Sequence, residues 1–164
     1  MNEQEEKEIE FPKELIEERE EPPGKKIYQS LYQQVMKMTI GEKIKLAVTG
    51  NREARNLLLK DANKLVLSAV INSPKMMEEE IIKICQSRSV SDEVLRLIAA
   101  KKELVKNYRT KLGLATNPKT PIPIAVKLLN YISEIDLRSI AKSKNVSTVV
   151  SRAAIRILED RGKL

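Results

Sequence analysis

Residues 95–99 read LRLIA, and residues 137–141 read LRSIA, 42 positions further along the chain. A more divergent stretch, ARNLL, occupies residues 54–58. Similarity at a period of about 40 residues is typical of helical-repeat proteins, in which each unit buries its apolar face against the next one. The spacing therefore predicts about three repeats, the smallest number that such architectures usually need for stability.

The periodicity of the apolar residues supports an all-α fold. From Ile27 onward these residues recur at positions i, i+3, i+4 and i+7, and no strand-like alternation of useful length occurs. Thr39 and Glu42 have the spacing of a capping box. Further cap candidates are Ser73 and Thr120, each followed by proline, and Ser91, Ser133 and Ser147. The predicted helices lie near residues 28–37, 40–49, 52–60, 62–72, 75–87, 91–100, 102–115, 121–132, 134–143 and 147–160.

The charge of the chain is divided unevenly. Residues 1–23 carry ten Glu and three basic residues, a net charge of −7, which leaves +14 on the remaining residues. This acidic stretch is poor in apolar residues and ends in Pro22-Pro23-Gly24, so we predict a disordered leader over residues 1–26 and a helical-repeat domain over residues 27–164. Alternatively, Pro12 opens a short helix in which Phe11, Leu15 and Ile16 share one face and fold against a partner.

The segment from Leu112 to Pro121, together with the LRLIA and LRSIA stretches, resembles the HEAT, armadillo and leucine-rich-repeat-variant group of α-solenoids. It is also similar to small uncharacterised bacterial helical-repeat proteins that carry a charged leader. The resemblance covers residues 30–160 and implies an α-solenoid of about three three-helix repeats, whose third helices line a concave surface. Some leucine-rich-repeat-variant proteins hold an iron–sulfur cluster in a cysteine-rich module, but the single cysteine, Cys85, cannot supply one.

The side chains that catalysis requires are scarce in this sequence. The chain has no histidine, and Cys85 lies in an apolar stretch that predicts a buried thiol. Three consecutive acids, Glu78–Glu80, fan around a helix and cannot converge on one ion, so we expect a solvated patch in a first helical turn. The five glycines have no phosphate-loop spacing. We therefore expect no enzymatic activity, no metal and no cofactor.

The basic residues of the predicted third helices are the candidates for partner binding. They are Lys60, Lys64, Lys102, Lys106, Arg109, Arg152 and Arg156. On amphipathic helices these side chains face away from the apolar stripe, which predicts a basic concave groove. The groove would serve an interaction adaptor that binds an acidic or phosphorylated segment of another protein. Sequence-tolerant binding of nucleic acid by the same residues is the alternative, and simple solubilisation of the helix surfaces is also open.

Three arginines have a different expected role. Arg55, Arg96 and Arg138 recur at matching places in the second helices, so we expect them to pair with acidic residues of neighbouring units; Asp61, Asp92 and Asp136 are available. The sequence also lacks an apolar run long enough to span a bilayer, and residues 1–25 lack the features of a signal peptide. These features predict a cytoplasmic protein that does not bind membranes; they leave its oligomeric state open.

Overall fold

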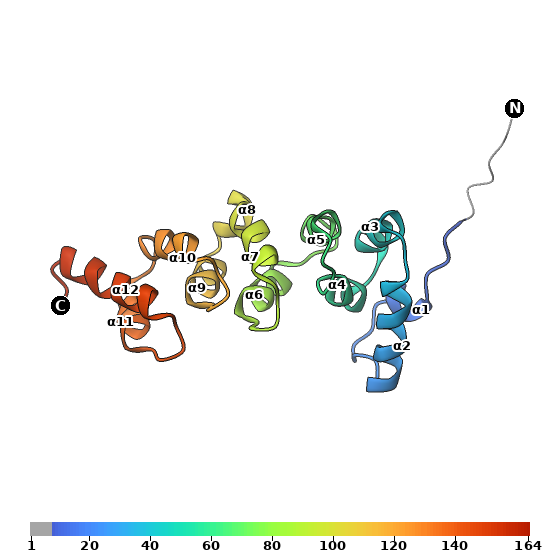
Figure 1. The fold of residues 1–164 in the computed structure, drawn as a ribbon, viewed down its shortest axis with the longest axis horizontal. Helices are drawn as coiled ribbons and strands as arrows, with labels where there is room; N and C mark the ends of the chain where they lie inside the picture. Colours follow the sequence, from blue (N-terminus) through green and yellow to red (C-terminus); the bar gives the residue numbers. More distant parts are fainter. Residues whose placement is uncertain (1–7) are drawn as a thin grey trace, which may run out of the picture. The chain divides into compact units, whose positions relative to one another are not determined.

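The computed structural model describes residues 8–164, which form twelve helices and no strand (Figure 1). The predicted all-α class is confirmed, although the sequence predicted ten helices. The chain divides into two compact units. The first ends at Lys75, and the second runs from Met76 to Leu164.

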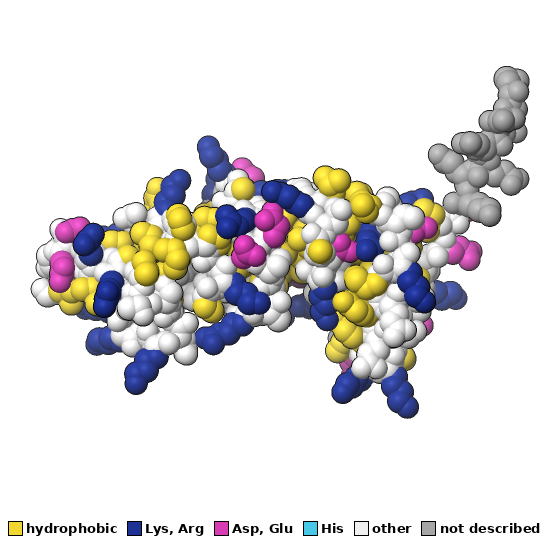
Figure 2. All heavy atoms as spheres, in the orientation of Figure 1, with side chains coloured by type: hydrophobic (Ala, Val, Ile, Leu, Met, Phe, Trp, Pro, Cys, Tyr) yellow, Lys and Arg dark blue, Asp and Glu magenta, His cyan; other side chains and the backbone are white. Residues whose placement is uncertain are grey.

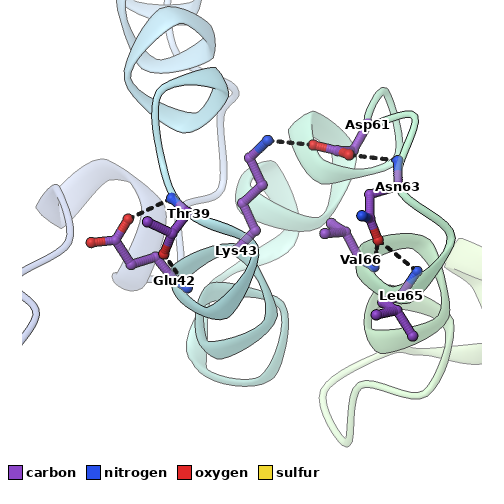
Figure 3. Close-up of polar contacts among 7 residues, drawn as sticks. All are labelled: Thr39, Glu42, Lys43, Asp61, Asn63, Leu65 and Val66. Carbon is purple, nitrogen blue, oxygen red and sulfur yellow. Dashed lines mark hydrogen bonds and ion pairs between the residues drawn. The ribbon is translucent and has the colours of Figure 1, made fainter.

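Five helices belong to the first unit: α1 (Lys13–Ile16), α2 (Lys25–Met36), α3 (Ile40–Thr49), α4 (Arg52–Leu58) and α5 (Lys64–Ile71). Helix α3 begins with the predicted capping box (Figure 3). The Thr39 amide donates to Oε2 of Glu42 at 2.7 Å, and the Glu42 amide donates to Oγ1 of Thr39 at 3.2 Å. The two bonds satisfy amides that the helix leaves without partners, so α3 starts where the sequence indicates.

A largely buried ion pair ties α3 to the turn that precedes α5. Nζ of Lys43 lies 2.6 Å from Oδ2 of Asp61, and the Asn63 amide donates to Oδ1 of the same carboxylate at 2.7 Å (Figure 3). Burial raises the pKa of Asp61, but the hydrogen bond from Lys43, the backbone hydrogen bonds of Asn63 and Ala62 and the charge of Lys43 together outweigh it, so the pKa lies below its ordinary value. The contacts help to hold α3 and α5 side by side.

The prediction of a disordered leader over residues 1–26 is wrong for α1, which lies inside it. Leu15 is fully buried, and the Asn51 side-chain amide donates to the carbonyls of Glu14 at 2.8 Å and Glu17 at 2.6 Å. This short helix follows Pro12, as the alternative interpretation expects, but it packs against α4 of its own chain. Helix α2 begins at Lys25, before the predicted boundary. Residues 1–7 of the predicted leader lie outside the described residues.

The second unit contains seven helices: α6 (Glu78–Gln86), α7 (Asp92–Ala99), α8 (Lys102–Val105), α9 (Tyr108–Thr116), α10 (Ile122–Leu129), α11 (Glu134–Lys142) and α12 (Thr148–Asp160). Helix α9 packs against α6 and α10, and α12 packs against α10 and α11. The predicted caps Ser91, Ser133 and Ser147 are confirmed: each accepts a backbone amide in the first turn of its helix. The side-chain amide of Asn117 donates to the carbonyls of Cys85 and Ser87, which fastens the end of α6 to the end of α9.

Two further predicted helix boundaries are wrong. The expected helix over residues 102–115 is broken, because Asn107 accepts the Thr110 amide at 3.2 Å and thereby caps a new helix, α9. The expected helix from residue 75 begins instead at Glu78. There the carboxylate of Glu80 accepts the Met77 amide at 3.0 Å. Glu80 is consequently buried, and only Glu78 and Glu79 form the solvated patch expected for the three acids.

The three recurring arginines are not structurally equivalent. Arg55 is the fourth residue after its cap, Asn51, and the buried Leu95 is the fourth residue after its cap, Ser91. Arg55 therefore matches Leu95, whereas Arg96 is the fifth residue after Ser91 and is exposed. Arg55 is buried and donates to the Gly50 carbonyl at 3.1 Å. Arg96 pairs with Asp92 of its own helix at 3.4 Å, which is not the expected pairing between units. Arg138 donates to the Lys163 carbonyl at 3.2 Å.

Candidate binding groove

The second unit has a groove of about 550 Å³ between α7–α8 and α10. Six of the residues that line it are apolar or aromatic and are called the floor below: Ala99, Ala100, Val105, Ile124, Leu128 and Tyr131. The other five are basic and are called the rim below: Arg96, Lys102, Lys106, Lys111 and Lys127. A volume of this size is typical of binding sites for small molecules and for a few side chains of a partner.

One wall of the groove is a single stripe of α10 and the residues that follow it. Ile124, Lys127, Leu128 and Tyr131 have the spacing i, i+3, i+4 and i+7, so they lie above one another on one face of the helical path. The opposite wall begins at the end of α7 with Ala99 and Ala100, whose small side chains leave the space between the walls open. Figure 2 shows hydrophobic side chains near α10 on the surface of this unit, bordered by Lys and Arg.

The basic rim is only weakly neutralised by the protein itself. Arg96 pairs with Asp92, and Lys106 pairs with Glu103, in both cases at 3.4 Å and between exposed side chains. Exposed pairs of this kind contribute at most about 1 kcal/mol. No acidic side chain of the described residues lines the groove.

Four further residues that line the groove present functional groups to solvent. Nζ of Lys111 lies 5.8 Å from the ring centroid of Tyr131, whose side chain is 62% exposed. Within residues 8–164, the side chains of Lys102 and Lys127 have no ion pair or hydrogen bond. The groove therefore combines apolar surface with ammonium groups that are available to an anion.

The structure places all seven sequence-predicted partner residues at exposed positions. Two of them, Lys102 and Lys106, line the groove. Arg109 lies on α9 and donates to Oε1 of Glu79 on α6 at 2.8 Å. Arg152 and Arg156 lie on α12 and do not line the groove.

The remaining two, Lys60 and Lys64, belong to the first unit. Nζ of Lys60 lies 4.8 Å and 5.5 Å from the ring centroids of Tyr28 and Tyr32 on α2. Two ring faces stabilise a cation, so Lys60 has a local partner in its own unit.

The sequence interpretation missed three residues of the basic rim. Lys111 and Lys127 were not among the candidates, and Arg96 was expected to have a purely architectural role. The signal for Lys127 is present in the sequence, because the predicted helix over 121–132 carries Ile124, Leu128 and Tyr131 on the same face. The small residues on the opposite wall, Ala99 and Ala100, carry no recognisable signal.

The residues that the sequence analysis considered for metal binding and nucleophilic chemistry can be placed in the structure. Among residues 8–164, no three His, Cys, Asp or Glu side chains cluster in a way that could hold a metal ion. Cys85 is fully buried, as predicted, and burial raises the pKa of its thiol to about 12. A thiol of this kind is protonated at neutral pH and is a poor nucleophile.

Comparisons with known proteins found no matching family model, no similar curated protein and no similar solved structure. The resemblance to HEAT and armadillo repeats therefore stays a prediction. In the described part of the chain, no helix combines the length and the apolar character that crossing a bilayer requires.

Proposed function

We propose that this chain is a non-enzymatic interaction adaptor built from HEAT- or armadillo-like repeats, and that its groove binds an acidic segment of another protein. The observation that carries the proposal is the composition of the groove, in which five basic residues surround an apolar floor and no described acidic residue takes part. Cations attract a negatively charged partner, and the floor stabilises that partner's apolar side chains.

The apolar floor favours a protein over a nucleic acid. Phosphate binding requires cations and hydrogen-bond donors, but it leaves Ile124, Val105 and Leu128 without a function in the groove. Base stacking requires aromatic side chains, and Tyr131 is the aromatic residue that lines this groove in the described structure. An acidic protein segment uses both the rim and the floor.

A capture experiment on an extract of the source cells tests the proposal. The full chain is compared with the double variant Lys102→Glu/Lys127→Glu and with the control Lys119→Glu/Lys144→Glu. The control makes the same change in net charge at exposed positions of the same unit that do not line the groove. We expect the wild type and the control to retain the same proteins after nuclease treatment, and the groove variant to lose them. Loss of all captured material on nuclease treatment contradicts the proposal and identifies the partner as nucleic acid.

A further inference from the structure

We infer that the groove takes one amphipathic α-helix of its partner, with apolar residues at spacing i, i+3 or i+4, and i+7, and with acidic residues on both flanks of that stripe. The inference rests on the proposed function and specifies the conformation and the pattern of the bound segment.

The walls of the groove favour a helical occupant. The α10 stripe formed by Ile124, Lys127, Leu128 and Tyr131 is a ridge of the kind that packs against another helix. In the first unit, helix α3 has such a helical neighbour within the chain, because α5 packs beside it. In the second unit α10 packs against α9 and α12, and the stripe that faces α7 and α8 borders open volume.

The other extended modes of peptide binding have no matching surface. Strand addition requires an exposed sheet edge, and residues 8–164 contain no strand. Polyproline recognition requires a groove lined with several aromatic rings, whereas Tyr131 is the aromatic side chain at this one. A helix that lies between two helical walls repeats the packing that the unit already uses.

The dimensions and charges define the pattern of the occupant. The residues from Ile124 to Tyr131 extend about 10 Å along the helical path at 1.5 Å per residue, which matches two turns of a partner helix. Two turns present two or three apolar side chains to the floor. Basic side chains lie on both walls, Lys102 and Lys106 on one side and Lys127 on the other, so acidic residues are expected on both flanks.

The occupant is expected to come from another protein. Of the described helices, α6 carries the densest acidic turn, but Glu78 and Glu79 already accept bonds from Asn107 and Arg109, and Glu80 is buried. Helix α1, in the acidic N-terminal stretch, has four residues, and its Leu15 is buried in the first unit. Neither can present a free apolar stripe of two turns.

The test uses two designed peptides of identical composition and of about 16 residues, a length at which an isolated helix is marginal in water. In one peptide, leucines have the spacing i, i+3, i+4 and i+7 and are flanked by glutamates. In the other, the same residues are permuted to remove the period. Fluorescence anisotropy measures the affinity of each peptide for the full chain, and circular dichroism measures the helix content that the bound peptide gains. We expect the periodic peptide to bind at least tenfold more tightly and to become helical on binding.

Variants separate this inference from the proposed function. Ala100→Gln places a longer uncharged side chain in the groove and should weaken the periodic peptide at least tenfold, whereas Ser139→Gln on α11 should not. If the wild type binds both peptides equally and the variant Lys102→Glu/Lys127→Glu binds neither, the helical occupant is overturned. The proposed binding of an acidic segment then remains in place. Binding of neither peptide overturns both proposals. Binding of vesicles of phosphatidylglycerol without binding of either peptide overturns both as well, and identifies the ligand as an anionic lipid.

Discussion

Two connections in the second unit differ in a way that accounts for the groove. Residues 143–147 join α11 to α12 as a short turn, in which the Asn145 amide donates to Oγ of Ser143 at 3.1 Å, and α11 packs directly along α12. Residues 100–107 join α7 to α9 and include a further helical turn, α8. Helix α7 contacts α8, and α8 contacts α9.

The comparison indicates that a longer connection can add lining residues to a groove whose other lining residues come from the helices themselves. Leu95 and Leu137 occupy equivalent places in α7 and α11, and both are fully buried. The longer connection supplies Lys102, Val105 and Lys106 to the groove. The shorter connection supplies no residue to it. Repeats with similar interiors can therefore differ in function through the segments that join their helices.

The largest expected effect contrasts a buried residue of α12, which follows the shorter connection, with a residue of α8, which lies within the longer one. Leu158 of α12 is fully buried, so Leu158→Ala should lower the free energy of unfolding by about 2–5 kcal/mol. Val105 of α8 is only partly buried, so Val105→Ala should cost about 1 kcal/mol or less. Urea denaturation measures both changes. Equal costs for the two variants would show that α8 is packed as tightly as α12.

The next effect concerns the packing of α9 on α6, and it depends on pH. Gly113 of α9 lies so close to Cys85 that a Cβ at that glycine would be 3.0 Å from the Cβ of the cysteine. Burial raises the pKa of the Cys85 thiol to about 12, whereas in the unfolded chain it lies near 8.5. Above the lower value the unfolded state releases a proton that the folded state keeps, so stability is lost as pH rises from about 8.5 to about 12.

We therefore expect the wild type to lose about 2 kcal/mol more stability than Cys85→Ala between about pH 8 and about pH 10. Denaturation of both proteins at each pH measures the difference. All other ionisable side chains are the same in the two proteins, so their contribution to the difference cancels. Parallel pH profiles would show that the thiol reaches solvent in the folded state.

A smaller effect concerns the caps that follow the two connections. Asn107 caps α9 and Ser147 caps α12, and replacement of either by alanine should lower the free energy of unfolding by about 1 kcal/mol. Asn107→Ser should recover most of the loss, because serine also accepts a backbone amide. An Asn107→Ala variant with unchanged stability and a higher helix content by circular dichroism would show instead that α8 and α9 merge into the single helix that the sequence predicts.

The smallest effects on stability come from substitutions of the exposed basic residues. Two pairs of such substitutions are expected to differ in their effect on peptide binding. Lys102→Glu/Lys127→Glu and Arg152→Glu/Arg156→Glu should each leave the free energy of unfolding within about 0.5 kcal/mol per substitution. The first pair should weaken the periodic acidic peptide at least tenfold, and the second pair should leave it nearly unchanged. Weaker peptide binding by Arg152→Glu/Arg156→Glu, with unchanged binding by Lys102→Glu/Lys127→Glu, would place the binding site on α12, where the sequence interpretation placed part of it.

Much of the helical architecture follows from local sequence signals. Capping residues such as Thr39, Ser91 and Ser133 act through the next three residues, so they can be recognised without tertiary information. Helix α1 was expected only in the alternative interpretation, because it has no side-chain cap and its order depends on Asn51 and on burial of Leu15 against α4. The same limit applies to Leu65, which has helical spacing for the core but is 64% exposed.

The candidate site was predicted less well than the fold. Exposure of the basic residues follows from amphipathic patterning, and it holds for Lys102 and Lys106 as well as for Arg152 and Arg156. Whether such residues meet around one cavity depends on the break at Asn107, which looks from the sequence like an ordinary helix interior. A polar residue in the middle of a predicted helix is therefore a useful signal for a second cap.

The separation of rim and floor in the groove has a kinetic consequence. Under the proposed function, ammonium groups on exposed rim positions would act over several ångströms before contact, so they would accelerate the encounter with an acidic partner, and added salt would slow this step. The apolar floor acts only after contact, so it governs how long the complex lasts. Association rates should therefore fall with ionic strength while dissociation rates change little, and residence time should depend on side chains such as Ile124 and Leu128.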